Sequence, residues 1–141
     1  MKRILIVSIF ILFAGFVLCA GCSSYAPPEL NIVPAIQQVN ISPETNTITY
    51  EVSLDIENAG GNNAYDVEIM ALVSTPKDLP EYRFIHENIP VGTVEKRSTI
   101  SVKRTLSLQM TPDNFRKLSS GERQAEVEAK EMMAEMLLAE I

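Results

Sequence analysis

Three side chains in this sequence could act as a nucleophile, a general base or a soft metal ligand: Cys19, Cys22 and His86. A catalytic Cys/His or Ser/His/Asp set needs a nucleophile beside an oriented base, and a zinc site needs several such ligands. His86 is the sole histidine and lies between Ile85 and Glu87 in a strand-like run, which is typical of a structural histidine. The sequence therefore predicts no catalytic residue, no metal site, no cofactor and no enzymatic activity.

The segment before Cys22 has the composition of an export signal. Two basic residues follow the first methionine, and residues 4–20 are almost entirely apolar. The small residue Gly21 precedes Cys22, so cleavage is predicted between these two, with residues 1–21 as the signal peptide. As a helix the apolar run would be about 25 Å long, close to the lower limit for crossing a bilayer. An uncleaved N-terminal anchor is therefore the competing interpretation.

Ala20-Gly21-Cys22 resembles the lipobox of prokaryotic lipoproteins, although Cys19 stands where that family usually has leucine. The resemblance implies that Cys22 is lipidated, with palmitate among its acyl chains, and becomes the mature N-terminus. Two acyl chains hold a protein on a membrane stably, whereas one chain binds only marginally. Membrane lipid attached through Cys22 is thus the expected partner. The rest of the chain is expected on the extracytoplasmic face of the cell membrane.

The mature chain, residues 22–141, would have the size of one small domain. Removing two of the twelve basic side chains with the signal leaves ten, against eighteen acidic ones, a formal charge of −8. Such a surface repels nucleic acid, and no nucleic-acid partner is expected. Cys19 leaves with the signal and Cys22 is occupied by lipid, so an apolar core must stabilise the domain without a disulfide.

Alternating apolar and polar residues predict an antiparallel β-domain over residues 35–130. The clearest strand covers residues 47–58, where five apolar side chains alternate with polar ones, and a loop rich in Asn and Gly follows. In the next strand the alternation places Tyr65 and Val67 on the buried face. Further strands are expected at residues 35–41, 82–89 and 98–108. Several short strands separated by turns are typical of a sandwich or barrel.

The flanking segments give weaker signals. Residues 22–34 contain three prolines and are expected to form an extended tether. Thr111-Pro112-Asp113 has the cap, first-turn proline and acid of a helix start. Residues 122–130 fit either a strand or a helix; a strand near 124–130 is favoured, followed by a helical tail over 131–141.

Asn58-Ala59-Gly60-Gly61, followed by Ala64-Tyr65-Asp66-Val67, is similar to a turn of the prokaryotic CARDB-like immunoglobulin-like domains. The later Ile89-Pro90-Val91-Gly92 also fits their pattern. The resemblance covers roughly residues 35–108 and implies an immunoglobulin-like β-sandwich without catalytic residues. A weaker resemblance is to the LEA14-like sandwich.

These observations predict a membrane-anchored, non-catalytic binding or scaffolding module with a protein partner of unknown identity. Two alternatives remain open. The sandwich could hold a small apolar ligand as a carrier or sensor, or it could be a LEA14-like stress-protective protein.

Overall fold

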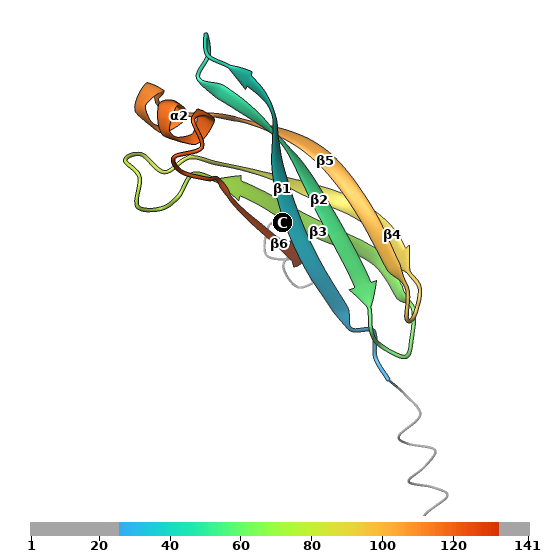
Figure 1. The fold of residues 1–141 in the computed structure, drawn as a ribbon. Coiled ribbons are helices and arrows are strands. Elements are labelled where there is room, and N and C mark those ends of the chain that lie inside the picture. Colours follow the sequence, from blue (N-terminus) through green and yellow to red (C-terminus); the bar gives the residue numbers. More distant parts are fainter. Residues whose placement is uncertain (1–25, 133–141) are drawn as a thin grey trace, which may run out of the picture.

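The computed structural model describes residues 26–132, which form six strands and one helix (Figure 1). The elements are β1 (Leu30–Ser42), β2 (Thr47–Asn58), β3 (Ala64–Ser74), β4 (Phe84–Val94), β5 (Thr99–Gln109), α2 (Pro112–Ser119) and β6 (Glu126–Glu131). The signal or anchor helix and nearly all of the C-terminal helical segment expected from the sequence lie outside these residues. Within 26–132, no helix is long and apolar enough to cross a bilayer.

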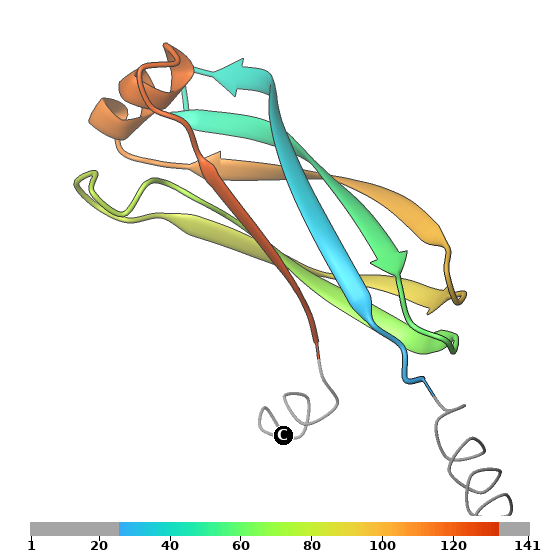
Figure 2. The same cartoon turned by 60° about the horizontal axis from the view of Figure 1, so that its bottom comes forward.

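The strands form two antiparallel three-stranded sheets, with orders β1-β2-β5 and β4-β3-β6. We call them the β2 sheet and the β3 sheet after their central strands. The sheets lie face to face as two layers, with β1 beside β6 at one edge and β5 beside β4 at the other (Figures 1 and 2). The prediction of an all-β antiparallel sandwich is therefore confirmed.

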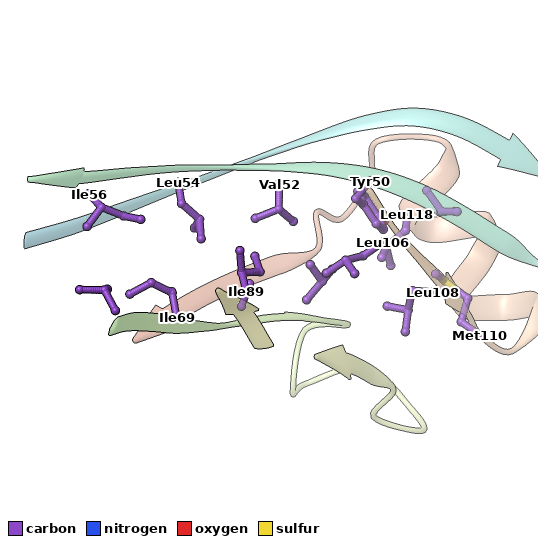
Figure 3. Close-up of a cluster of buried hydrophobic side chains, with 14 of the residues drawn as sticks. Tyr50, Val52, Leu54, Ile56, Ile69, Ile89, Leu106, Leu108, Met110 and Leu118 are labelled. Atoms are coloured by element: carbon purple, nitrogen blue, oxygen red, sulfur yellow. The ribbon is translucent and has the colours of Figure 1, made fainter. Parts of the chain in front are cut away.

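The core lies between the two sheets and follows the alternation of β2. Ile48, Tyr50, Val52, Leu54 and Ile56 all point inward and are buried, while the residues between them face solvent. They meet inward side chains of the β3 sheet and of β5 (Figure 3). Since apolar burial contributes roughly 25 cal/mol per Å², this packed layer supplies the main stabilisation of a domain that has no disulfide among its described residues.

Two strands are longer than the sequence indicated, and both contain proline. β1 begins at Leu30, so residues 30–34, expected in the tether, belong to the sandwich. β4 continues through Pro90 and Gly92, beyond the end of the strand expected at residues 82–89. Both strands are sheet edges, where a proline at the solvent side removes no ladder hydrogen bond. Proline therefore marks the edges here and does not end the strands.

A bulge at the start of β3 changes the face of one aromatic residue. The pairing with β4 shifts between Ala64 and Val67, and Asp66 has a positive φ of 51°. The extra residue places Ala64 and Val67 inside, while Tyr65 is 69% exposed. The expectation that Tyr65 shares the buried face of Val67 is wrong, because simple alternation cannot anticipate a bulge.

The helix lies at one end of the sandwich, and the last strand completes the β3 sheet. Thr111 caps α2 by accepting a hydrogen bond from the Asn114 amide at 3.3 Å, as its sequence indicated, and Leu118 joins the core. Glu126–Glu131 then forms β6 beside β3, so the choice between strand and helix is decided for a strand. Residue 131, expected to begin the helical tail, is the last residue of β6.

Candidate anchoring pole and docking face

The chain enters the sandwich at the end opposite α2 (Figures 1 and 2). We call this end the tether pole. It consists of residues 26–29, the β2–β3 connection at 59–63 with the first residues of β3 (64–66), and the β4–β5 turn at 95–98. The opposite end, made by α2 and the loop at 75–83, is called the helix end.

Asn58, the last residue of β2, holds the tether pole together. Its side chain is fully buried, and its amide oxygen accepts hydrogen bonds from the backbone amides of Glu29 (3.2 Å) and Gly60 (3.0 Å). Its amide nitrogen donates to the carbonyl oxygens of Asn62 (2.8 Å) and Val94 (3.0 Å). Both donors and both lone pairs of the side chain are thus used. One buried amide links the tether, the β2–β3 connection and the end of β4.

Further hydrogen bonds, most of them between backbone groups, add to this linkage. The Ala59 amide donates to the Glu29 carbonyl at 2.8 Å, and the Asn62 side chain donates to the Ala26 carbonyl at 2.6 Å. The Arg97 amide donates to the Asn58 carbonyl at 2.7 Å. Residues 26–29 are therefore fastened to the domain and do not act as a loose spacer.

Gly60 is required by the closeness of the tether. A Cβ atom at this position would lie 2.2 Å from the Pro27 carbonyl oxygen and 2.6 Å from the Glu29 nitrogen. Both neighbours are backbone atoms, which cannot rotate away. The Asn-x-Gly sequence at the end of β2 therefore serves as the contact site of the tether.

The outer face of the β3 sheet differs from that of the β2 sheet. On β2 the outward row is polar throughout: Thr49, Glu51, Ser53, Asp55 and Glu57. On β3 the corresponding row contains Met70 and Leu72, which are half-buried, with no layer of described residues above them. A solvent-facing sheet normally carries polar side chains there, so the apolar row indicates a docking surface.

Aromatic and acidic side chains border this apolar row. Three aromatic rings form a row where β4 begins: Tyr82 just before the strand, then Phe84 and His86 within it. The ring centroids of Tyr82 and Phe84 are 5.8 Å apart, and those of Phe84 and His86 are 6.3 Å apart. Phe84 is 54% exposed. In the sheet register, Leu72 of β3 lies between two polar residues. It is opposite His86 of β4 on one side and opposite Glu128 of β6 on the other. We define the docking face as Met70, Leu72, Phe84, His86, Glu126, Glu128 and Lys130, the last of which lies opposite Met70.

Two acidic residues on the outer face of β2 contact polar side chains of β5. Glu51 lies 3.3 Å from the Lys103 ammonium, and Asp55 accepts a hydrogen bond from the Ser101 hydroxyl at 2.6 Å. Within residues 26–132, no group of three or more His, Cys, Asp or Glu side chains is placed to hold a metal ion. The outer face of the β2 sheet is therefore a polar surface, on which Glu51 is paired with Lys103 and Asp55 with Ser101.

A shallow depression of about 250 Å³ opens between β1 and the α2–β6 connection, whose Arg123 also lines it. Ile36, Tyr50, Leu118 and Ala125 supply apolar walls, and Gln38 and Gln124 are polar neighbours. The Tyr50 hydroxyl makes no hydrogen bond to another described residue. Burial raises the pKa of Tyr50 to about 12, because the phenolate would lose its hydration.

The residues that the sequence singled out and those that the structure brings together differ. Gly21 and Cys22, the predicted cleavage and lipidation residues, lie outside the described residues. His86 is described and is stacked on Phe84, on the surface. Asn58 and Tyr65 were missed as functional candidates. The Asn-x-Gly-Gly signal of the loop could have indicated the first, whereas the bulge that exposes the second has no clear signal in the sequence.

Comparisons with known proteins identify no family. No protein-family model matches the chain, and no curated protein has significant sequence similarity to it. Among solved structures, a protein assigned as ApaA from Bordetella pertussis is similar, with 13% identity and a TM-score of 0.45. The alignment covers 57% of this chain and 68% of that one.

Proposed function

We propose that this chain is an extracytoplasmic lipoprotein, held on the cell membrane through Cys22, whose immunoglobulin-like sandwich is a non-catalytic binding module. The proposal rests on the hydrogen bonds that attach residues 26–29 to the end of β2 and to the β2–β3 connection. A domain that is anchored by its N-terminus must resist force at the point where the tether enters. The buried Asn58 side chain supplies that resistance, because its four hydrogen bonds join three separate segments.

The docking face is the binding surface in this proposal. Its centre is apolar and one border is aromatic. The other border carries Glu126 and Glu128 beside Ser74 and Leu72, and Lys130 beside Met70. A partner segment with apolar side chains flanked by Lys or Arg would complement the apolar centre and the two glutamates of this face. Such a partner would bury Leu72 and Phe84 and pair with the two glutamates.

Lipidation is tested by the mass of the N-terminal peptide from the membrane fraction. The wild type is expected to begin at Cys22 and carry acyl chains, and Cys22→Ser is expected to lose both. Cys19→Ser is the matched control, because Cys19 would leave with the signal peptide. A wild-type chain that retains residues 1–21 and a free Cys22 thiol would contradict lipidation and favour the uncleaved anchor.

Binding is tested with a photocrosslinking residue at Phe84 or, as a control, at Thr105 on the outer face of the β2 sheet. The same partner should be captured from Phe84 and not from Thr105. Its capture should be lost when Glu126 and Glu128 are changed together to Lys. Equal capture from both positions, or capture unaffected by the charge reversal, would reject the docking face.

A second candidate function is binding of a small ligand at the depression beside Tyr50. The free Tyr50 hydroxyl and the two glutamine side chains favour it. Its volume lies below the range of about 300–1,000 Å³ typical of ligand pockets, so a ligand of few atoms would be required. A ligand that co-purifies with the wild type and is lost in Tyr50→Phe would support this function.

A further inference from the structure

The length of chain between Cys22 and the sandwich limits how far the domain can stand from the membrane. Ala26 is fastened by the Asn62 side chain, so residues 23–25 alone separate a lipidated Cys22 from the tether pole. Four peptide steps span at most about 14 Å when fully extended. The tether pole must therefore lie close to the lipid headgroups, if Cys22 is anchored as proposed above.

The side chains at this pole suit a headgroup layer. Tyr65 is 69% exposed, more than Tyr82 at the helix end, which is 42% exposed. Its hydroxyl accepts a hydrogen bond from the Asn63 side chain at 3.4 Å. Tyrosine is enriched at membrane interfaces because its ring is apolar and its hydroxyl is polar.

Two basic residues lie on the adjoining β4–β5 turn. Lys96 is held by a hydrogen bond from its amide to the Asn63 side chain at 2.9 Å, and Arg97 by its bond to Asn58. Both are exposed. Long cationic side chains can extend toward lipid phosphates while their stems cover apolar surface.

The net charge of the pole indicates which lipid it fits. Lys96 and Arg97 are outnumbered by Glu29, Asp66 and Glu95, so the formal charge of these five side chains is −1 and the pole is not basic overall. Attraction to anionic lipid is therefore excluded as the main contribution. A zwitterionic headgroup, which offers both phosphate and ammonium, complements this mixed surface.

We infer that the tether pole is a membrane-contact surface, in which Tyr65, Lys96 and Arg97 sit among zwitterionic headgroups. This inference rests on the proposed anchoring at Cys22. The long axis of the sandwich then stands away from the bilayer. About nine strand residues separate the Tyr65 end of β3 from its Ser74 end, a distance of roughly 30 Å. The helix end, with Tyr82, stays in water.

The absence of tryptophan from the sequence provides a clean test. Tyr65→Trp and Tyr82→Trp each introduce a single fluorophore at an exposed tyrosine, one at each end of the domain. The full chain, purified from membranes in detergent, is reconstituted into phosphatidylcholine vesicles with and without a nitroxide-labelled headgroup lipid. We expect Tyr65→Trp to be quenched several-fold more strongly than Tyr82→Trp. Adding salt should leave the difference intact.

The outcomes separate this inference from the proposed anchoring. If the chain sediments with the vesicles but Tyr65→Trp is quenched no more than Tyr82→Trp, the anchoring stands and the membrane-contact surface is rejected. If the wild type does not sediment with the vesicles, or if Cys22→Ser sediments equally well, lipid anchoring itself is rejected. Circular dichroism of both tryptophan variants confirms that each retains the β-fold.

Discussion

Glu29 and Asn58 lie at opposite ends of the β1–β2 pair in sequence, yet the Glu29 amide donates to the Asn58 side chain at 3.2 Å. The next bond runs the other way, from the Ala59 amide to the Glu29 carbonyl at 2.8 Å. The tether is thus bound on both its donor and its acceptor side. This arrangement joins the point where the chain enters the domain to the core of the sandwich.

Replacing Asn58 with Ala should destabilise the domain by about 2–4 kcal/mol. The change removes four hydrogen bonds, of which those to Gly60 and Val94 are buried and those to Glu29 and Asn62 are part-buried. Water can reach the part-buried groups, whereas each buried group left unpaired costs about 1–3 kcal/mol. Asn62→Ala is the control, because its side chain makes one exposed hydrogen bond to the tether and should cost less than about 1 kcal/mol. Urea unfolding of both variants measures the difference. Equal destabilisation would contradict the central role of Asn58.

Replacing Gly60 with Ala should release the tether, because the added Cβ would overlap the Pro27 carbonyl. The Ala59 amide, which donates to Glu29, should then exchange hydrogen faster. Gly92→Ala is the matched control. Gly92 has open space around it but a φ of +84°, so the substitution costs roughly 1 kcal/mol in backbone strain. Faster exchange of the Ala59 amide in both variants would show that general destabilisation, and not the tether contact, is measured.

The stability of the domain should fall in alkaline solution because of Tyr50. The folded pKa is about 12 and the unfolded value is 10.0, so the folded state retains a proton that the unfolded chain loses. Stability from this group is complete below pH 10 and declines between pH 10 and pH 12, by at most about 2.7 kcal/mol.

Tyr50→Phe should remove this part of the pH dependence while changing stability little at pH 7, since the hydroxyl has no described hydrogen-bond partner. Urea midpoints at pH 8 and pH 11 for the wild type and Tyr50→Phe give the comparison. Tyr65→Phe, at the exposed tyrosine of the tether pole, controls for the loss of a phenol. An unchanged alkaline loss in Tyr50→Phe would assign it to other groups.

Asn114 should control the loop at the helix end. Its side chain is fully buried and donates to the carbonyls of Pro80 (2.5 Å) and Glu81 (3.1 Å). Asn114→Ala should cost about 1–3 kcal/mol and expose the loop, so that trypsin cuts faster after Lys77.

Asp78→Asn tests the neighbouring ion pair in the same loop. The Arg123 guanidinium, 2.5 Å away, holds the pKa of Asp78 below its usual range through a hydrogen bond. Asp78 is exposed and Arg123 is half-exposed, so solvent screens the pair and its contribution to stability is small. Trypsin cleavage after Lys77 should therefore change much less in Asp78→Asn than in Asn114→Ala. The reverse order would assign the loop to the ion pair.

The sequence by itself determined the features that depend on neighbouring residues. The alternation over residues 47–58 predicted β2 and its two faces, because side chains of a strand point alternately to either side. Thr111 and Pro112 predicted where α2 begins, because a cap and a first-turn proline act within one helical turn. The resemblance of Ala20-Gly21-Cys22 to a lipobox implies lipidation of Cys22, and this stays a prediction.

The tertiary structure alone decided the features that depend on distant residues. Pro34 and Pro90 lie within strands because those strands are edges, which strand order determines. Tyr65 is exposed because β3 shifts its register against β4, and the apolar outer row of β3 gains its aromatic and acidic borders from β4 and β6. Two of the four partners of the Asn58 side chain, Glu29 and Val94, lie 29 and 36 positions away in the sequence. Hydrogen bonds of that kind form only when the sheets bring their ends together, so no local pattern contains them.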